Sequence, residues 1–529
     1  RQEGRVPRLE ELVGQFGRRL RSLEDFRSRA APASAALTGV SSSSLRLAPG
    51  FIFCALKGHK THGARFAAEA IEKKVAAVLL ETPAPRECLG GLKKLASEHG
   101  VALWAAANLK DWLGELANWV YGDPSTKLDL IAVTGTSGKT TSCYLMESMA
   151  QAAGLRTGVL GTVSNRVAER LREASLTTPQ PDEAIALMAE MVEARCDVCF
   201  MEATSQALDM GRLEDLEFNG AVFANLSRDH LDYHHTMESY FKVKAGLFFR
   251  LLDGSNKKKR FAAANGSDPW GARLLARLPS LRGVRRVGFG LLDGRRLGRW
   301  PVAARAVQVE FDGTHFELKI GSSFYPTRLR LIGRHNVFNA LSAAAAGWAM
   351  GLAPKRIVEG LEALAFVPGR LERIDNNQGI LVFVDYAHKP DALENVLETL
   401  RAVRGLKRLI VVMGCGGDRD PGKRPLMGEI ATRLADVAVF TSDNPRSEDP
   451  EKILDAIEGG ARRAGRSNFA RQADRRLAIR LAFQDARPGD CVLVAGKGHE
   501  TYQIFAGETI HFDDREVCRE ILISLPKIS

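Results

Sequence analysis

The sequence predicts an α/β protein of three domains, because short apolar runs alternate with helical patterns along most of the chain. A chain of 529 residues is longer than one hydrophobic core usually supports, so several domains are expected. Strands that alternate with helices are typical of mostly parallel sheets with right-handed crossovers. The sequence shows no apolar stretch long enough for a membrane span and no regular internal repeat.

The first predicted domain, residues 1–125, is a small α/β unit. Apolar runs at 50–58 and 74–81 enclose a helical pattern at 63–74, and another apolar run follows at 101–107. We expect the domain to end near the segment WVYGDPSTK.

The second predicted domain, residues 126–366, is a central ATPase-type domain with a phosphate loop (P-loop) and a mostly parallel sheet. It starts with the apolar run 128–135, which a glycine-rich turn and a long helical segment follow. Further apolar runs at 196–202 and 220–226 extend the same pattern. The order of strand, glycine-rich turn, helix and further strands is therefore typical of a nucleotide-binding domain.

The third predicted domain, residues 367–529, is a Rossmann-like α/β domain that begins after the turn VPGR. Its strand candidates are the runs GILVFVDYA, RLIVVMGCG, VAVFTSD and DCVLVAGKG. Each run ends in a polar or glycine-rich cluster. Ligands of open α/β sheets bind beyond the carboxyl ends of the strands, so these clusters mark a predicted site.

Composition leaves the kind of partner open. Lys and Arg exceed Asp and Glu by 11, which suits nucleic acid, an anionic membrane or an anionic small substrate. The 8 cysteines are scattered and do not form a disulfide or zinc framework. Cys196 and Cys199 form a C-x-x-C inside an apolar run, where buried strand thiols are favoured over a redox motif. A reducing, cytoplasmic environment is expected.

The segment TGTSGKTTS, residues 134–142, predicts a phosphate loop, because it follows an apolar strand and precedes a helix. Backbone N–H groups at the helix start and the point charge of Lys139 would hold phosphates, and the Thr140 hydroxyl could ligate magnesium. In the usual pattern the first glycine would fall at Val133, and this chain has Gly135 instead. The motif indicates a nucleoside triphosphate and leaves a kinase, a GTPase and a ligase open.

Two further clusters could hold a metal. Glu202 ends the second strand of the central domain, where a phosphate-loop protein places a magnesium carboxylate. After the third strand the sequence NLSRDHLDYHH supplies Asp229, His230, Asp232, His234 and His235. These residues lack the spacing of a known zinc helix, and both zinc and magnesium remain open. By itself Lys244, on an amphipathic helix, reads as a solvated charge.

A series of motifs resembles the Mur ligase family in order and spacing. They are GTSGKTTS, TTP, NLSRDHLDYH, YFKVKAGLF, GRHNVFNALSAAA, DYAHKPDAL, GCGGDRDPGKRPLMG, DNPRSEDP and AGKGHE. The resemblance covers residues 38–516 and is closest to the MurE type, the members that add 2,6-diaminopimelate to UDP-N-acetylmuramoyl-L-alanyl-D-glutamate.

The resemblance implies an ATP-dependent amide ligase of peptidoglycan precursor synthesis, and hence a role in cell-wall biogenesis, cell shape and cell division. ATP would phosphorylate the substrate carboxylate, and the amine of meso-diaminopimelate would displace phosphate from the acyl phosphate. A lysine-adding ligase of the same family and a catalytically silent scaffold homologue remain alternatives. The expected protein is a cytoplasmic monomer that binds neither nucleic acid nor membrane, since no nucleic-acid module is recognised.

The resemblance also implies a catalytic centre with two Mg²⁺ ions. The ions would be held by Thr140, Glu202, His230 and Lys244, with Lys244 converted by carbon dioxide to a carbamate, an anionic oxygen ligand. The implied catalytic residues are Lys139, Glu202, His230 and Lys244. The implied ATP-binding residues are Gly135, Thr136, Ser137, Gly138, Lys139, Thr140, Thr141, Asn336, Asp385, Tyr386 and His388.

The implied contacts to the UDP-N-acetylmuramoyl dipeptide come from the first and central domains. They are Ser44, His59, Lys60, Thr61, Thr177, Thr178, Thr204 and Arg212. This chain has Ser43-Ser44-Leu45 where Asp-Ser-Arg is common in the family, which puts the uridine or diphosphate contacts in doubt. Thr204 replaces a common serine, and Met210 stands where some members have glutamine.

The implied diaminopimelate pocket lies in the third domain. Its residues are Arg419, Asp443, Asn444, Pro445, Arg446, Gly496 and Glu500. A guanidinium fixed on a proline-stiffened turn can hold the distal carboxylate of diaminopimelate through two parallel hydrogen bonds. Lysine lacks that carboxylate and would leave Arg446 unpaired, while Glu500 would meet the neighbouring ammonium.

Overall fold

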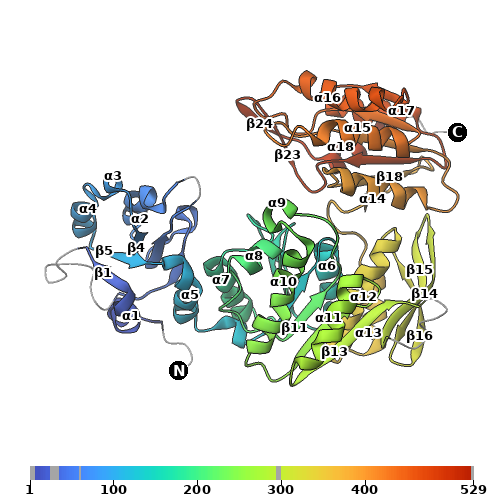
Figure 1. The fold of residues 1–529 in the computed structure, drawn as a ribbon. Coiled ribbons are helices and arrows are strands. Elements are labelled where there is room, and N and C mark those ends of the chain that lie inside the picture. The colour runs from blue at the N-terminus through green and yellow to red at the C-terminus, as the bar shows by residue number, and fades with distance from the viewer. Residues whose placement is uncertain (1–5, 24–34, 59–60, 293–299, 526–529) are drawn as a thin grey trace. The chain divides into compact units, whose positions relative to one another are not determined.

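The computed structural model describes residues 6–23, 35–58, 61–292 and 300–525 (Figure 1). The chain forms two compact units. The first unit consists of Arg1–Thr136, Gly154–Ala263 and Arg273–Arg286, and the second consists of Ser137–Ala153, Ala264–Ala272 and Val287–Ser529.

The first unit begins with a five-stranded sheet in the order β1-β5-β4-β3-β2. Its strands are β1 (Leu20–Ser22), β2 (Gly39–Ser41), β3 (Phe51–Ala55), β4 (Ala77–Thr82) and β5 (Ala102–Ala107). All neighbours are parallel except β1, which runs antiparallel to β5. Because side chains alternate along a strand, Ile52 and Phe53 enter different cores on opposite faces of the sheet.

Helices cover both faces of this sheet. The core that contains Ile52 also takes residues from α1 (Leu9–Phe16) and α5 (Leu113–Tyr121). The core that contains Phe53 takes residues from α2 (Ala67–Glu72) and α4 (Leu92–His99). The apolar face of each amphipathic helix is thereby buried, and the loops at the carboxyl ends of the strands stay accessible.

The first unit also contains a nucleotide-binding type of sheet, in which β11, β6, β10 and β7 lie side by side and are parallel. These strands are β6 (Asp129–Thr134), β7 (Thr157–Leu160), β10 (Val198–Glu202) and β11 (Gly220–Phe223). Beyond β7 the sheet continues through the short antiparallel strands β8 (Asn165–Val167) and β9 (Arg170–Arg172). Parallel strands share one carboxyl edge, which places the ends of β6, β7, β10 and β11 together.

In the second unit, α6 (Lys139–Ala152) packs against α12 (Arg334–Met350) and α13 (Pro354–Ala363). The helices approach closely, since a Cβ atom at Gly360 would lie 2.3 Å from the Met149 Cα. The strands β13 (Val284–Leu291), β14 (Val302–Glu310), β15 (Gly313–Ile320) and β16 (Ser323–Leu329) follow in sheet order. β14 to β16 form an antiparallel meander, which the sequence analysis did not predict.

The C-terminal sheet of the second unit has the order β17-β18-β22-β19-β20-β21. Its strands are β17 (Glu372–Arg373), β18 (Leu381–Asp385), β19 (Leu409–Met413), β20 (Val437–Phe440), β21 (Phe469–Arg471) and β22 (Cys491–Ala495). All neighbours are parallel except β17. A two-stranded hairpin, β23 (Tyr502–Phe505) and β24 (Glu508–His511), follows β22.

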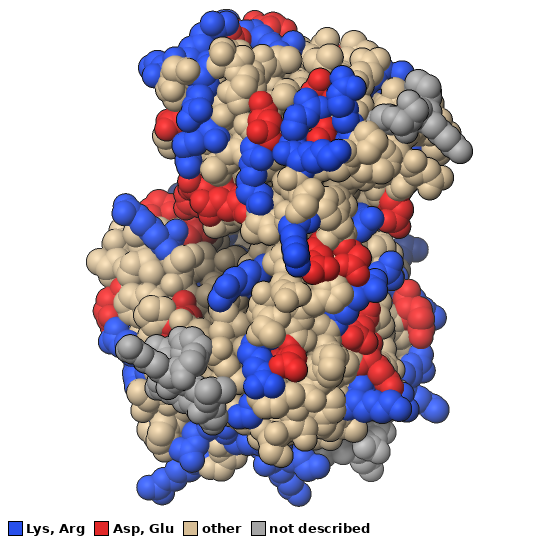
Figure 2. Space-filling model, turned by 90° about the vertical axis from the view of Figure 1, so that its right-hand side faces the viewer, with Lys and Arg blue, Asp and Glu red and all other residues tan. Residues whose placement is uncertain are grey.

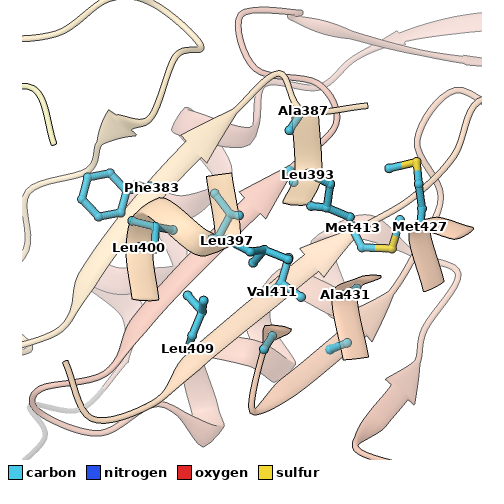
Figure 3. Close-up of a cluster of buried hydrophobic side chains, with 14 of the residues drawn as sticks. Phe383, Ala387, Leu393, Leu397, Leu400, Leu409, Val411, Met413, Met427 and Ala431 are labelled. Atoms are coloured by element: carbon cyan, nitrogen blue, oxygen red, sulfur yellow. The ribbon is translucent and has the colours of Figure 1, made fainter. Parts of the chain in front are cut away.

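Helices lie on both faces of the C-terminal sheet (Figure 1). One face packs against α14 (Pro390–Arg401), α15 (Lys423–Leu434) and α16 (Pro450–Arg463), and the other against α17 (Arg475–Asp485) and α18 (Asp514–Ser524). Figure 3 shows Leu393, Leu397 and Leu400 of α14 beside side chains of β18 and β19. This apolar layer holds the strands of the C-terminal sheet in place, and the predicted diaminopimelate-binding residues follow the carboxyl ends of these strands.

The structure confirms an α/β fold with mostly parallel sheets. The apolar runs singled out in the sequence are the strands β3, β4, β5, β6, β10, β11, β18, β19, β20 and β22. Cys196 and Cys199 are buried beside and within β10, as expected for strand thiols.

Charge on the face drawn in Figure 2 is mixed, with acidic side chains between the lysines and arginines. Within the described ranges, no helix is both long and apolar enough to cross a bilayer.

Candidate active site

The segment 134–142 joins the end of β6 to the start of α6, the arrangement that a phosphate loop requires. Thr136 donates its backbone N–H to the carbonyl oxygen of Asn225 at 3.2 Å and to its Oδ1 at 3.1 Å. Gly138 has φ 83°, and a Cβ atom there would lie 2.2 Å from Asn339 Oδ1. A glycine is therefore required both by the backbone conformation and by the approach of α12.

The predicted phosphate-binding residues occupy the loop and the first turn of α6. Lys139 is the first helical residue, Thr140 and Thr141 are buried, and Ser137 is exposed. The N–H groups of a helix start have no partner within the helix and attract anions. The loop can therefore bind phosphate through its backbone as well as through the Lys139 ammonium.

Glu202 lies at the carboxyl end of β10 with only 1% of its surface exposed. Its Oε1 accepts the backbone N–H of Thr162 at 2.8 Å, and its Oε2 accepts the Thr162 hydroxyl at 3.1 Å. Thr162 follows β7, the parallel neighbour of β10, so both residues come from adjacent strand ends. These bonds fix the carboxylate at the edge of the sheet, where the phosphate loop also begins.

The structure brings several predicted substrate contacts next to Glu202. The Thr178 hydroxyl donates to the carbonyl oxygen of Glu202 at 2.7 Å and accepts the N–H of Thr204 at 3.1 Å. Arg212 donates to the carbonyl oxygen of Thr178 at 3.2 Å, and burial lowers the pKa of Arg212. The hydroxyl oxygens of Thr162 and Thr177 are 3.1 Å apart. This group of hydroxyls and one guanidinium suits a polar, anionic substrate.

Lys244 lies on α10 (Met237–Gly246) and is 1% exposed, so its interpretation as a solvated charge is wrong. Its Nζ is 2.9 Å from the Gly135 carbonyl oxygen and 3.4 Å from the Thr134 hydroxyl. The ammonium also lies 4.8 Å from the centre of the Tyr240 ring. The helix thus delivers an amine to the first residues of the phosphate loop.

The histidines after β11 are placed differently from one another. His234 is buried, lies 2.9 Å from the Ser205 hydroxyl and stacks on Tyr240, and burial lowers its pKa. His230 is more exposed, has φ 52° and lies 3.4 Å from Asp229. In the described part of the chain, the one group of three side chains close enough to share an ion is Glu310, Asp312 and His315.

The nucleotide contacts predicted farther along the chain lie in the second unit. Asn336 donates to the Ile332 carbonyl oxygen at 2.9 Å and accepts from Asn339 at 2.9 Å. Asp385 is buried and accepts the backbone N–H groups of Leu371 and Ala387 at 2.6 and 2.8 Å. Burial raises the pKa of the Asp385 carboxyl. Asp385 thus fixes the turn after β18.

Tyr386 and His388 lie on that turn. Their rings are 4.5 Å apart, and His388 Nδ1 lies 2.8 Å from the Tyr386 carbonyl oxygen. Burial raises the pKa of Tyr386 to about 12 and lowers the pKa of His388. Both side chains are therefore neutral near pH 7 and suit stacking and hydrogen bonding with a planar ligand.

Arg446 follows β20 in a backbone conformation with φ 55°, which is uncommon for a residue with a side chain. Its N–H donates to the Ile504 carbonyl oxygen at 2.9 Å, and its guanidinium donates to the Gly417 carbonyl oxygen at 2.7 Å. A Cβ atom at Gly417 would lie 1.8 Å from the Pro445 carbonyl oxygen, so the two loops are in close contact. Arg419, two residues beyond Gly417, is exposed.

The remaining predicted pocket residues gather around a buried lysine. Asn444 donates to Glu500 Oε2 at 2.9 Å, and Lys497 lies 3.1 Å from the same oxygen and 3.2 Å from Asn444 Oδ1. Asp443 is 3.7 Å from Lys497. Gly496 joins this cluster to the turn after β18 by donating its N–H to the Asp385 carbonyl oxygen at 3.0 Å.

Two family models match the chain over the elements just described. The Mur ligase middle domain matches residues 133–347, and the Mur ligase glutamate ligase domain matches residues 369–498. The chain belongs to the Mur ligase family.

Individual Mur ligases resemble the chain over nearly its whole length. A UDP-N-acetylmuramoyl-L-alanyl-D-glutamate--2,6-diaminopimelate ligase of Solibacter usitatus is 40% identical over 486 residues, which are 92% of this chain and 93% of that protein. The protein of the same name from Geobacter metallireducens is 41% identical and covers 91% of this chain and 93% of its own length.

Solved structures of Mur ligases share the fold. The structure of a UDP-N-acetylmuramoyl-L-alanyl-D-glutamate--2,6-diaminopimelate ligase has a TM-score of 0.64 and 30% identity, and covers 98% of this chain and 99% of that one. A MurF ligase of Thermotoga maritima in complex with ADP has a TM-score of 0.63 at 17% identity, covers 92% and 97%, and supports the fold alone.

Two of the predicted substrate contacts in the first part of this Mur ligase, Ser44 and Thr61, can be located in the structure. Ser44 contributes its carbonyl oxygen to Lys73 at 2.7 Å, and Thr61 is exposed. His59 and Lys60 lie outside the described residues. A cavity of about 1730 Å³ in the first unit is lined by Ser43 and Leu45 on one side and by α7 (Pro181–Glu193) on the other.

Sequence reasoning missed several residues of these clusters. Thr162 could have been found as the residue beyond the end of the next parallel strand, and Lys497 lies inside the quoted AGKGHE motif. Ser42 donates its backbone N–H and its hydroxyl to the Asp182 carboxylate at 2.7 and 3.0 Å, and Arg46 pairs with Glu183 at 2.6 Å. No sequence signal pointed to these last two pairs, because their partners are far apart in the chain.

Proposed function

We propose that this Mur ligase uses ATP to join meso-diaminopimelate to the D-glutamyl carboxylate of UDP-N-acetylmuramoyl-L-alanyl-D-glutamate in peptidoglycan precursor synthesis. The observation that carries the proposal is the placement of Asn444 and Arg446 just after β20 and of Glu500 after β22, with Asn444 bonded to Glu500. The names of relatives that are about 40% identical over nine tenths of the chain support it.

A carboxylate is a poor electrophile, so the reaction needs activation before an amide can form. The γ-phosphoryl group of ATP passes to the carboxylate oxygen and ADP is released. The lone pair of the diaminopimelate amine then attacks the acyl carbon, the C–O bond to phosphate breaks, and the amine loses a proton. Positioning and charge stabilisation are the main demands of both steps.

The chain has side chains and backbone groups that suit both the positioning of the substrates and the stabilisation of charge. The start of α6 and the Lys139 ammonium hold the ATP phosphates, and Asn336 with the turn after β18 contacts the nucleoside. Thr177, Thr178, Thr204 and Arg212 hold the acyl dipeptide beside Glu202. The catalytic groups that we assign are Lys139, Glu202, His230 and Lys244.

The donor set at this site fits two Mg²⁺ ions only if Lys244 is modified. Glu202 offers carboxylate oxygens at a strand end, Thr140 a hydroxyl and His230 an imidazole, whereas an ammonium cannot ligate a cation. Carbon dioxide converts a neutral lysine amine to a carbamate, which supplies the missing oxygens. Bound Mg²⁺ would offset the negative charge of the phosphate and carboxylate oxygens.

Selectivity for diaminopimelate over lysine follows from the pocket. The half-buried Arg446 guanidinium donates to the Gly417 carbonyl oxygen through one nitrogen only, so lysine would not leave it unpaired; the distal carboxylate of diaminopimelate would add a charged partner that lysine lacks. A hydrogen bond between charged groups contributes roughly 1.5–3 kcal/mol, so about tenfold to a hundredfold selectivity is expected. In a lysine-adding ligase this arginine would have no substrate carboxylate to bind.

We infer that the protein acts as a cytoplasmic monomer that binds neither nucleic acid nor membrane. All 8 cysteines are free, which suits a reducing compartment. The mixed charge seen in Figure 2 suits a small anionic substrate better than a nucleic-acid backbone. We further assign three domains, 1–125, 126–366 and 367–529, each of which contains one main sheet.

Product formation tests the proposal. Purified protein is incubated with ATP, Mg²⁺, the UDP-dipeptide and either meso-diaminopimelate or lysine, and both ADP release and the mass of the tripeptide product are measured. We expect product with diaminopimelate and at least tenfold lower kcat/KM with lysine. Equal or better turnover of lysine would reject the specificity, and no product with any amine would reject the ligase itself.

A further inference from the structure

Lys497 is a buried cation that sits between the amino-acid-binding residues of the second unit. None of its side chain is exposed, yet it comes from the loop directly after β22, at the edge of the sheet where the ligand binds. Its Nζ lies 3.1 Å from Glu500 Oε2, 3.2 Å from Asn444 Oδ1 and 3.7 Å from Asp443 Oδ1. A buried ammonium with three oxygen neighbours is held in one position.

Lys497 sets the orientation of the Asn444 amide. Asn444 Oδ1 accepts from Lys497 and also from the backbone N–H of Ile504 at 3.0 Å, and only an oxygen can accept both bonds. The Asn444 NH₂ group must therefore face Glu500, and it donates to Oε2 at 2.9 Å. Glu500 Oε2 is thus used by two donors, and Oε1 takes no part in this network.

Asp443 supplies a second acidic group that is not fully satisfied. It is 7% exposed, and among the described residues its buried Oδ1 has no hydrogen-bond partner. Lys497 at 3.7 Å is its ion-pair partner. Lys497 and its two acidic neighbours, Asp443 and Glu500, together carry two carboxylates and one ammonium, so these three side chains alone have one excess negative charge.

We propose that Lys497 is a positioning and specificity residue of the amino-acid pocket, which holds Glu500 and Asn444 and leaves a single excess negative charge for the non-reacting ammonium of the incoming amino acid. This inference rests on the proposed function. Without Lys497 two carboxylates would face each other with no cation between them, and the Asn444 amide would be free to turn. Arg446 then holds the distal carboxylate, and the Lys497 cluster holds the ammonium on the same carbon.

Replacement of Lys497 tests this role. In Lys497→Met the KM for diaminopimelate should rise roughly tenfold to a hundredfold, while the KM values for ATP and the UDP-dipeptide change less than about twofold. Lys452→Met, an exposed lysine of α16 in the same domain, is the matched control and should behave like the wild type. The double variant Lys497→Met/Glu500→Gln removes both charges of the closest ion pair. Its effect on the KM for diaminopimelate should be smaller than the product of the two single effects, because the residues are coupled.

Wild-type turnover separates this inference from the proposed function. If the wild type makes no product with diaminopimelate, the proposed function fails. If the wild type is active and Lys497→Met lowers kcat with an unchanged KM for diaminopimelate, or raises all three KM values alike, the positioning role is rejected. If Lys497→Met does not fold, Glu500→Gln and Asn444→Ala replace it, and strictly multiplicative effects of these two variants on the KM would equally reject a shared network.

Discussion

The Lys244 ammonium nitrogen lies 2.9 Å from the carbonyl oxygen of Gly135, the second residue of the phosphate loop. The lysine is almost fully buried, and its helix α10 carries it to the carboxyl end of β6. In the proposed reaction the phosphoryl group of ATP is transferred at this edge of the sheet. The first prediction therefore concerns Lys244.

Lys244→Ala should lower kcat by about a hundredfold or more, because the carbamate that we propose at this position would be lost as an oxygen ligand of Mg²⁺. The carbamate is a carboxylate-like group, so formate or acetate should restore part of the activity of the alanine variant. The measurement is ADP release with and without the added anion, and Lys242→Ala, which lies on the same helix, is the control. Full activity of Lys244→Ala would contradict the assignment of this residue.

Gly138→Ala and Gly154→Ala separate backbone strain from contact with the nucleotide site. Both glycines have φ 83°, so alanine should destabilise the protein by about 1–2 kcal/mol at either position. Only at position 138 would the Cβ atom meet Asn339, whose side chain also bonds Asn336. We therefore expect a raised KM for ATP in Gly138→Ala alone, measured together with the thermal midpoint of each variant. An equal rise in KM for ATP in both variants would remove the special role of the Gly138–Asn339 contact.

His499 should make the protein less stable in acid. Burial lowers its pKa to about 4, with further contributions from Arg370 and Arg515, while Glu500 acts in the opposite sense. The folded protein therefore favours neutral His499, and its contribution to stability is complete above the unfolded pKa of about 6.5 and is lost as the pH falls toward about 4. The loss should be about 1–2 kcal/mol.

The variant His499→Gln isolates this effect. Thermal midpoints of the wild type and the variant are compared at about pH 7 and about pH 4.5. The wild type should lose more stability than the variant between the two conditions. Parallel curves would show that His499 is not held neutral by the fold.

Sequence patterns were sufficient for the elements with strong local signals. The runs that became β18, β19 and β22 are short, apolar, rich in β-branched residues and followed by glycine or polar residues, and these features together are typical of a buried parallel strand. The meander β14 to β16 was missed, because its strands are only partly buried and mix polar with apolar residues. Such strands depend on pairing with neighbours rather than on local composition.

The same difference between local signals and long-range contacts applies to the site residues. Lys139 and Glu202 could be predicted from their places after a strand or at its end. The burial of Lys244 could not be predicted from composition, since a lysine on a helix with charged neighbours is usually solvated. The pair Ser42–Asp182 spans 140 residues of sequence, and only folding brings the two together.

Arg446 gives the most direct test of the account. kcat/KM for meso-diaminopimelate and for lysine is measured in the wild type, in Arg446→Ala and in the exposed control Arg466→Ala. We expect Arg446→Ala to lose about tenfold to a hundredfold in kcat/KM for diaminopimelate and little for lysine, so that the preference for diaminopimelate is lost. An unchanged ratio of the two values in Arg446→Ala would contradict the central claim that this guanidinium recognises the second carboxylate.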